Sequence, residues 1–238
     1  MFLIRTLHKW FGLILGLQFL LWSISGAMMA MLDAKKVAAE DSERAPPALS
    51  QPLSPIRLAS LAQSLDAPIL RARLRPLGEH YVYEVETPLD LRLFDAATGA
   101  PVTIDAPRAQ ALAQAGYAGS GAVASVEKVE KVSGEVRGVT LPVWRVAFAD
   151  PDHTTLFVDP RTGAIHHRVN DTTRTWNLFW MIHIMDYPNG AGFNHPLIVT
   201  VATGCVWLAL SGFILLVRSF RRQDFAYVLD PIDKLRGR

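Results

Sequence analysis

The sequence predicts an α+β membrane protein in which two transmembrane helices flank a domain built from two α/β repeats. Two long, uncharged apolar runs lie near the ends of the 238-residue chain, at residues 10–32 and 197–217. An apolar run of about 20 residues can cross the hydrocarbon core of a membrane as a helix. Between the two runs, helix-like and strand-like patterns follow one another twice. Each series ends in the same Asp-x-x-Thr-Gly motif, at residues 95–99 and 159–163.

The first apolar run predicts a membrane anchor at residues 10–32, preceded by a cytoplasmic N-terminus at residues 1–9. Arg5 and Lys9 stand in front of the run, and a small-residue patch at residues 23–27 resembles a signal-peptide cleavage region. However, the run continues apolar as far as Leu32, which is longer than a usual cleaved signal. We therefore expect an uncleaved transmembrane helix.

The second apolar run predicts a transmembrane helix at residues 196–217, followed by a basic tail at residues 218–238. Residues 1–32 carry a net charge of +2 and residues 196–238 carry +3, which leaves −3 for the middle of the chain. Short basic segments remain in the cytoplasm, so both termini are expected there and the central domain on the outer side. We interpret these basic ends as topology signals next to lipid headgroups, and the charge pattern indicates no nucleic-acid partner.

The segment between the helices predicts a tether and two α/β repeats. Residues 33–54 are rich in alanine, proline, serine and charge, which is typical of a flexible tether. The first repeat, at residues 55–105, has a helical pattern at 55–65 and strand patterns at 81–86 and 91–94. The second, at residues 106–170, has a helical pattern at 107–114 and strand patterns at 125–132, 143–148 and 156–158. In each Asp-x-x-Thr-Gly turn, the aspartate accepts from the turn backbone and the glycine supplies a positive φ.

An interfacial amphipathic helix is predicted at residues 174–187, directly before the second membrane run. If this segment is helical, Trp176, Phe179, Trp180 and His183 share one face. An aromatic stripe ending in an imidazole can hold a flat cofactor. It is equally typical of an anchor at the membrane surface, where tryptophan and tyrosine collect.

The start of the first membrane helix offers a second candidate site. His8 and Gly12 share a helix face, and Gly16 follows four residues later. One interpretation is that the glycines make room for a macrocycle beside a histidine ligand. The other is a Gly-x-x-x-Gly motif that packs against a neighbouring helix.

His183 and His195 are the predicted iron ligands on the outer side of the membrane. The glycine-containing loop at residues 187–194 can fold back and bring the two imidazoles together. Asn194 is the expected N-cap of the second membrane helix, and Asp186 is a candidate acceptor for a ligating ring. His8 lies across the membrane, roughly 30 Å away. A haem at His8 would therefore be five-coordinate or would need a ligand from another protomer or subunit.

The remaining metal-ligating side chains give weaker signals. Four histidines in the central domain are interpreted as surface or turn residues, namely His80, His153, His166 and His167. Five methionines fall near the predicted outer face, namely Met28, Met29, Met31, Met181 and Met185. Together with imidazoles they suit copper(I) or a His/Met haem, whereas methionine also serves as a flexible apolar filler. The single cysteine, Cys205, lies inside the second apolar run, so no intrachain disulfide can form.

Several of these segments resemble one family. Leu-His-Lys-Trp-Phe-Gly at residues 7–12, Ser-Gly at 25–26 and His-Ile-Met-Asp-Tyr-Pro at 183–188 resemble PepSY-associated transmembrane proteins. The helix-then-strands units that end in Asp-x-x-Thr-Gly resemble PepSY domains. The resemblance implies a bacterial inner-membrane protein with a periplasmic domain of two PepSY-like repeats. It also implies haem b, and electron transfer to a periplasmic acceptor such as a ferric siderophore.

The resemblance leaves open how the redox path is completed and whether the protein is an enzyme. This chain has two predicted membrane helices, whereas the larger reductases of the family have four or more. A homodimer, or association with another membrane redox subunit, would supply the missing helices. The tail at residues 218–238 contains no nucleotide or flavin fingerprint, so electrons would have to come from another protein or from quinones. The alternative function is a non-enzymatic, membrane-tethered PepSY module that binds or regulates a partner.

Overall fold

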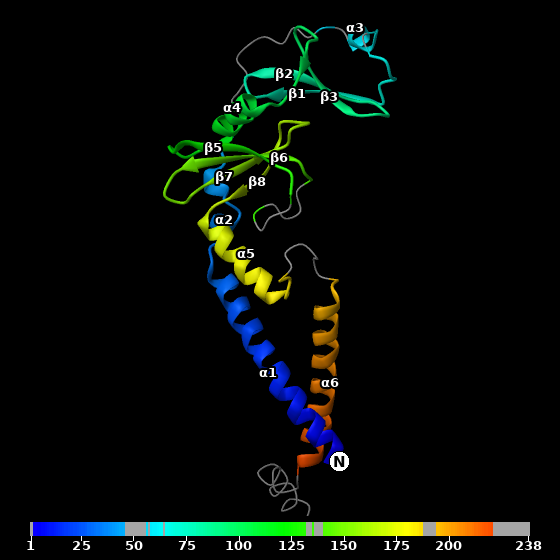
Figure 1. The fold of residues 1–238 in the computed structure, drawn as a ribbon, viewed down its shortest axis with the longest axis vertical. Helices are drawn as coiled ribbons and strands as arrows, with labels where there is room; N and C mark the ends of the chain where they lie inside the picture. The colour runs from blue at the N-terminus through cyan, green and yellow to red at the C-terminus, as the bar shows by residue number, and fades with distance from the viewer. Residues whose placement is uncertain are drawn as a thin grey trace, which may run out of the picture. The chain divides into compact units, whose positions relative to one another are not determined.

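The computed structural model describes residues 2–45, 56, 58–63, 65–131, 135, 140–187 and 194–220. The chain divides into two compact units (Figure 1). We call Met1–Ala27 together with Trp180–Arg238 the membrane unit, and Met28–Phe179 the sheet unit. Two long apolar helices at the ends of the chain and a central domain of sheets and helices confirm the predicted fold class.

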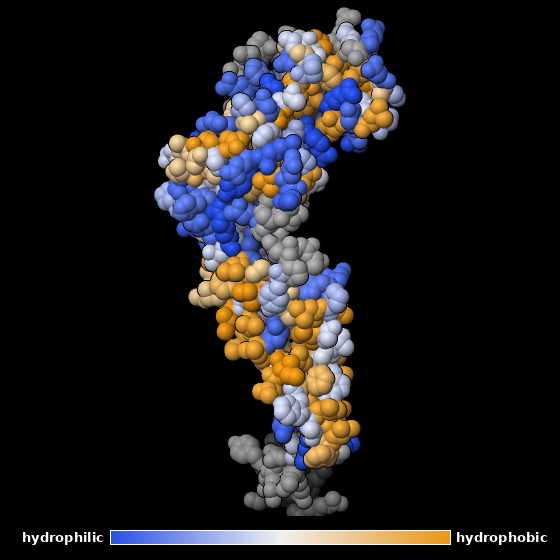
Figure 2. Space-filling view, in the orientation of Figure 1, coloured by the Kyte–Doolittle hydropathy of each residue, from blue (hydrophilic) through white to orange (hydrophobic). Residues whose placement is uncertain are grey.

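The two terminal helices are α1 (Phe2–Met31) and α6 (Pro196–Ser219), and both are long enough to span a membrane. Only 11% of the most apolar window of α1 and 6% of that of α6 is buried within the protein. The core helix of a water-soluble protein would bury most of such a surface. Figure 2 shows the apolar side chains of these helices at the surface of the molecule. Because such a surface is unfavourable in water, the chain is a membrane protein with two candidate spans.

The first sheet has four antiparallel strands in the order β1-β2-β3-β4. They are β1 (Arg71–Leu77), β2 (His80–Glu86), β3 (Leu91–Asp95) and β4 (Pro101–Val102), and helix α3 (Leu58–Gln63) precedes them. The predicted strands at 81–86 and 91–94 are confirmed. The sequence pattern did not predict β1 or β4. Strand β1 was missed although arginines at 71, 73 and 75 alternate with Ala72 and Leu74, a polar/apolar alternation that is typical of a half-buried strand.

The second sheet repeats this arrangement, with antiparallel strands in the order β5-β6-β7-β8. Helix α4 (Ala106–Gly116) comes first, and the strands are β5 (Ala122–Val129), β6 (Val143–Ala149), β7 (Thr155–Val158) and β8 (Ile165–Val169). The Asp105 side chain caps α4 by accepting from the backbone of Arg108. The two predicted α/β repeats therefore correspond to two successive units of one helix followed by four strands.

Both Asp-x-x-Thr-Gly motifs form the predicted turns, one between β3 and β4 and the other between β7 and β8. Asp95 Oδ1 accepts from the backbone nitrogens of Ala97 and Thr98, and Asp159 Oδ1 accepts from that of Arg161. The glycines have φ values of +76° at Gly99 and +71° at Gly163. Since positive φ is accessible to glycine without strain, the motif fixes each turn locally.

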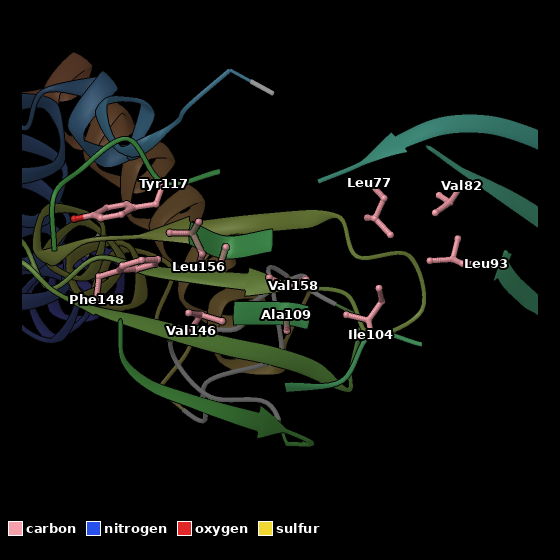
Figure 3. Close-up of a cluster of buried hydrophobic side chains, with 11 residues drawn as sticks. Leu77, Val82, Leu93, Ile104, Ala109, Tyr117, Val146, Phe148, Leu156 and Val158 are labelled. Atoms are coloured by element: carbon pink, nitrogen blue, oxygen red, sulfur yellow. The ribbon is translucent and has the colours of Figure 1, made fainter. Parts of the chain in front are cut away.

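One apolar cluster joins the two repeats (Figure 3). Leu77, Val82 and Leu93 reach it from the first sheet, and Ala109 reaches it from α4. Val146, Phe148, Leu156 and Val158 reach it from the second sheet. Smaller clusters cover the outer faces, around Val85 and Phe94 on the first sheet and around Val143 and Phe157 on the second. The repeats thus share a core and are not independent domains.

The first part of the predicted tether contains short regular elements. Residues 33–45 contain the short helix α2 (Ala34–Val37) and the 3-10 turn η1 (Glu40–Ser42), followed by a bridge between Glu43 and Tyr117. Asn170 Nδ2 donates to Lys36 O, at 2.9 Å, and ties this segment to the end of β8. Backbone hydrogen bonding therefore fixes a stretch whose polar composition indicated a loop. The rest of the predicted tether, residues 46–54, lies outside the described residues.

Helix α5 (Asp171–His183) follows β8 and confirms the predicted amphipathic helix, although it ends earlier than expected. The Asn170 side chain caps its start by accepting from the backbone nitrogen of Thr173. The helix stops at His183, and Met185 has a positive φ of 54°. Non-glycine residues rarely adopt this conformation, and it reverses the chain directly after the histidine.

Candidate functional site

The membrane unit brings α1 and α6 together along one face of each helix. The rings of Phe11 and Trp207 lie 4.8 Å apart between centroids, and Leu15 is buried. A Cβ added to Gly204 would lie 3.1 Å from Leu15 Cδ1, so the missing side chain lets Leu15 approach α6. Residue numbers rise along α1 as they fall along α6, so the helices are antiparallel. Such small-residue contacts are typical of helix pairs in membranes.

His8, near the start of α1, is hydrogen-bonded to a serine on α6. Its Nδ1 lies 2.8 Å from the Oγ of Ser211. That hydroxyl also lies 3.0 Å from the carbonyl oxygen of Leu208. When Ser211 donates its single proton to Leu208, its Oγ accepts from His8 Nδ1–H, and the lone pair of the imidazole is then on Nε2.

Gly212 makes room for the His8 ring. A Cβ at Gly212 would lie 3.0 Å from His8 Cε1, closer than nearly all real Cβ contacts. The Ser211-Gly212 pair thus supplies both a hydrogen-bond acceptor and space for the imidazole. Sequence reasoning missed this pair because both residues look like ordinary packing positions in an apolar run.

His183, the last residue of α5, has the same arrangement with a serine on α1. Its Nδ1 lies 3.1 Å from Ser25 Oγ, which donates to the carbonyl oxygens of Leu21, at 2.6 Å, and Trp22, at 3.2 Å. When the Ser25 hydroxyl donates to the α1 backbone, its oxygen accepts from Nδ1–H of His183, and the lone pair of the imidazole is then on Nε2, as in the corresponding tautomer of His8.

The surroundings of His183 also match those of His8. A Cβ at Gly26 would lie 3.4 Å from His183 Cε1, so the glycine after Ser25 faces the ring. The Trp22 ring lies 6.4 Å from that of His183, at 45° between planes. The two serines are buried, whereas the two histidines are only partly buried. The membrane unit thus contains two histidine–serine–glycine contacts built in the same way.

The two contacts lie at different depths of the helix pair. Ser25 is 17 residues after His8 on α1, which corresponds to a rise of about 25 Å. A single iron cannot bind both His8 and His183. The structure thus retains the predicted separation between an inner and an outer candidate site.

His195 caps the start of α6. Its Nε2 lies 3.0 Å from the carbonyl oxygen of Ile184, which can only accept, so Nε2 carries the proton. Its Nδ1 accepts from the backbone nitrogen of Ile198, at 3.4 Å, and His195 is the N-cap of α6 in place of Asn194. Both ring nitrogens are therefore engaged within the protein. To bind an iron, His195 would have to give up one of these hydrogen bonds.

The predicted glycine groove is only partly present. Gly12 faces α6, where an added Cβ would lie 3.8 Å from Leu208 Cδ1, whereas a Cβ on Gly16 would meet no atom within 4 Å. The glycines that contact the histidine rings are Gly26 and Gly212.

The other predicted residues lie along α5 and at the ends of the membrane helices. Trp176 and Trp180 are half-buried on α5. Asp186 is buried, but His183 Nδ1 bonds to Ser25 and not to this carboxylate. Met28 and Met31 are exposed, Met29 and Met181 are half-buried, and Met185 is buried.

The four histidines of the sheet unit have structural contacts. His153 Nδ1 lies 2.7 Å from Asp171 Oδ2, and His166 Nε2 lies 3.1 Å from Asp159 Oδ2. His166 is exposed, and its neighbour His167 is half-buried beside Phe157, as expected for adjacent residues of a strand. His80 opens β2 and is exposed. Among the described residues, no group of three or more histidine, cysteine, aspartate or glutamate side chains is arranged to hold a metal ion.

The serine contacts of His8 and His183 are of the kind that orients an imidazole ligand. An axial imidazole must be neutral and present a lone pair, and a hydrogen bond from its other nitrogen orients it. The Nδ1-protonated tautomers of His8 and His183 have this arrangement. His195 does not, because its two nitrogens are used for α6 capping and for Ile184.

Comparison with known proteins gives one match. The family described as PepSY-associated TM region matches residues 5–236. No curated protein matches the chain, and no solved structure matches it. The family match covers both candidate histidines, both serine–glycine pairs and the two sheets. The chain belongs to the PepSY-associated TM region family.

Proposed function

We propose that this chain is a haem b protein of the bacterial inner membrane that passes electrons to a periplasmic acceptor. His183 and His8 are the proposed axial ligands, each in a separate site. The observation that carries this proposal is the shared contact between histidine Nδ1 and a buried serine hydroxyl, which leaves Nε2 as the nitrogen that would bind iron. Bound haem b would supply one-electron transfer at its iron.

The serines are positioning residues in this proposal. Ser25 would hold the His183 ring through Nδ1, and donation of its own proton to the α1 backbone would favour the tautomer with Nδ1–H. Ser211 would do the same for His8. Loss of such an outer hydrogen bond typically lowers metal affinity by about 10–100-fold. The serines would therefore control both ligand orientation and ligand basicity.

The chain offers one suitably arranged histidine at each depth, so a second axial ligand has to come from elsewhere. A homodimer would pair each histidine with its counterpart and would provide four membrane helices. A different membrane redox subunit is the other source of a ligand. In either case the partly exposed His8 and His183 lie where a neighbouring helix can reach them.

The direction of electron flow follows from the charge distribution. The basic ends favour a cytoplasmic location for both termini, which puts His8 near the inner side and His183 near the outer side. Electrons would enter from quinones or from another membrane protein and leave at the periplasmic surface. A ferric chelate such as a siderophore is the acceptor that the family resemblance implies.

The experiment uses the full-length chain purified in detergent from a haem-replete bacterial host. The haem α band is recorded after reduction and removal of excess reductant, and ferric citrate is then added. The proposal predicts that the band decays while ferrous iron forms in equivalent amount. A colourless protein, or a reduced band that persists in the presence of ferric citrate, would contradict it.

One observation favours the alternative function, a non-enzymatic module that binds a partner. The sheet unit contains a cavity of about 740 Å³ whose lining includes Leu77 and Val82 from the first sheet and Leu112 from α4. This volume lies within the usual range of about 300–1,000 Å³ for ligand pockets. Under this alternative, the histidine–serine bonds only hold the membrane helices together. A folded, monodisperse protein without haem would favour it.

A further inference from the structure

The sheet unit contains a second, smaller cavity whose walls carry an excess of positive charge. Its volume is about 280 Å³, and three arginines line it, Arg44, Arg75 and Arg168, with Glu43 as the one acidic residue of the lining. We propose that this cavity binds a small molecule bearing a carboxylate or phosphate oxyanion. This inference is independent of haem binding, because every residue involved belongs to the sheet unit.

The arginines come from three separate parts of the sheet unit. Arg75 lies on β1, Arg168 lies on β8, and Arg44 follows η1. The η1 segment is fixed by its bridge to Tyr117, and Arg44 N donates to Gly116 O at 3.0 Å. The cavity is therefore built where the two repeats and the N-terminal segment meet.

Arg75 is a rigid part of the wall. Its Nε donates to Glu84 Oε2 at 2.6 Å, and its Nη2 donates to the carbonyl oxygen of Thr162. The side chain is 18% exposed, so these bonds are largely shielded from water. Arg75 Nη1 also donates to Pro76 O, at 3.4 Å. Two of the five guanidinium N–H groups then remain available to a ligand. Little side-chain entropy remains to be lost when a ligand binds.

Arg168 has an incompletely paired guanidinium edge. Its Nη2 lies 3.2 Å from Glu43 Oε1, while its Nε is shielded from solvent and has no hydrogen-bond partner among the described residues. Nε and Nη2 form the fork that normally grips two oxygens of one carboxylate or phosphate. Glu43 occupies half of this fork and leaves the other half unsatisfied. An unpaired, shielded N–H is unfavourable, and a ligand oxyanion is the group that would complete it.

Arg44 supplies a charge that has no acidic partner among the described residues. Arg44 is exposed, and its side chain forms no ion pair with a described residue. By contrast, Arg75 is paired with Glu84, and Arg168 is paired with Glu43. The C-terminus of α4 also borders the cavity and carries partial negative charge, but Gly116 O already accepts from Arg44. The net positive charge of the cavity lining thus favours the binding of an anion.

Glu43 is expected to act as an internal competitor. Its side chain is 55% exposed, so it can swing into solvent and release the fork of Arg168. The cavity lies just below the range of about 300–1,000 Å³ typical of small-molecule pockets, so a compact ligand is indicated. Recognition by planar forks is shared by carboxylates and phosphates, and the experiment has to separate them.

The test is isothermal titration calorimetry of the full-length protein in detergent at low ionic strength. The probes are inorganic phosphate, citrate and glycerol phosphate, the last representing a phospholipid headgroup. Wild type is expected to bind at least one of them. Arg168→Gln and Arg44→Gln should weaken that binding about tenfold or more, since each removes a charge-assisted contact. Arg168→Lys should also weaken it, because lysine keeps the charge but lacks the fork.

Glu43→Gln gives the opposite and more specific signature, because removal of the competing carboxylate should tighten binding severalfold. Arg92→Gln is the matched control, since Arg92 pairs with Asp90 and does not line the cavity. Thermal midpoints of all variants establish folding, and Arg44 and Glu43 are exposed, so their substitutions should be tolerated. Failure of all three probes to bind, or equal affinities for wild type, Glu43→Gln and Arg44→Gln, would overturn the proposal.

Discussion

His183 Nδ1 lies 3.1 Å from Ser25 Oγ, and that hydroxyl in turn donates to the carbonyl oxygen of Leu21 at 2.6 Å. These contacts favour the tautomer of His183 in which Nδ1 carries the proton. His8 has the same relation to Ser211 and Leu208. Two histidines with equivalent hydrogen bonds, one near each side of the predicted membrane span, are the feature on which the proposed function depends.

Ser25→Ala is expected to destabilise the membrane unit and weaken any haem bound at His183. The substitution leaves Nδ1–H of His183 without its acceptor, at a cost of about 1–3 kcal/mol for a shielded donor. Haem affinity should fall about 10–100-fold through loss of ligand orientation. Thermal unfolding in detergent and haem content per protein measure the two effects. Ser23→Ala is the control, because Ser23 is exposed on the same helix; equal losses in both variants would argue against a specific role of Ser25.

Gly212→Ala is expected to disturb the His8 contact, whereas Gly16→Ala should be tolerated. The new Cβ at position 212 would lie 3.0 Å from His8 Cε1, so the ring or α6 must shift and the 2.8 Å bond to Ser211 is strained. Such overpacking costs about 1–3 kcal/mol. A Cβ at Gly16 meets nothing within 4 Å, and alanine favours a helix by about 0.5–1 kcal/mol. Thermal midpoints in detergent distinguish the two, and equal midpoints would contradict the close packing at His8.

The overall fold could be predicted from the sequence because its signals are local. Charge-free runs indicate spans, and Asp95 and Gly99 determine one turn without help from the rest of the chain. Strand β1 also has a local signal, since arginine alternates with Ala72 and Leu74, but the prediction did not use it. The polar segment at residues 33–45 is ordered by tertiary partners such as Asn170.

The candidate site was predicted only in part, because the hydrogen-bond partner of each histidine depends on how the helices pack against one another. The sequence singled out His183, His195 and His8, but it could not show which serine each ring meets. Ser211 lies opposite His8 only because α1 and α6 are antiparallel and in a particular register. Each apolar run contains a Ser-Gly dipeptide, at 25–26 and 211–212, and this was a signal that could have indicated both contacts. The sequence did not indicate that His195 caps α6 through Nδ1.

The stability of the sheet unit is expected to fall as the pH drops below about 6.5. Burial lowers the pKa of His167 below its ordinary value of 6.5, because the charged form is poorly solvated beside Phe157. In the unfolded chain this histidine binds a proton at a higher pH than in the folded protein. Its contribution to stability is therefore fully present above 6.5 and is lost as the pH falls through the lower folded pKa.

Chemical unfolding of the full-length protein between pH 5 and pH 8 measures this effect, with tryptophan fluorescence as the signal. His167→Phe should flatten the pH dependence, since phenylalanine keeps a ring at this position and cannot titrate. His80→Phe replaces an exposed histidine and should leave the dependence as in wild type. An unchanged pH profile in His167→Phe would show that another group is responsible.

The charge distribution predicts that both termini lie in the cytoplasm and the sheet unit in the periplasm. With Cys205 replaced by alanine, a single cysteine at exposed Glu79 should react with a membrane-impermeant maleimide in intact cells with a permeabilised outer membrane. A cysteine at exposed Lys9 should react only after the inner membrane is broken. The reverse labelling pattern would invert the proposed direction of electron flow.

The most direct measurement of the central claim is the haem content of histidine variants, from reduced-minus-oxidised spectra of the purified full-length protein. The account predicts that wild type carries haem b and that His183→Ala and His8→Ala each lose part of it. His183→Ala with His8→Ala should lose all of it, whereas His153→Ala, at an exposed site of the sheet unit, should lose none. A wild-type protein without haem, or a double variant with the full wild-type spectrum, would contradict the account.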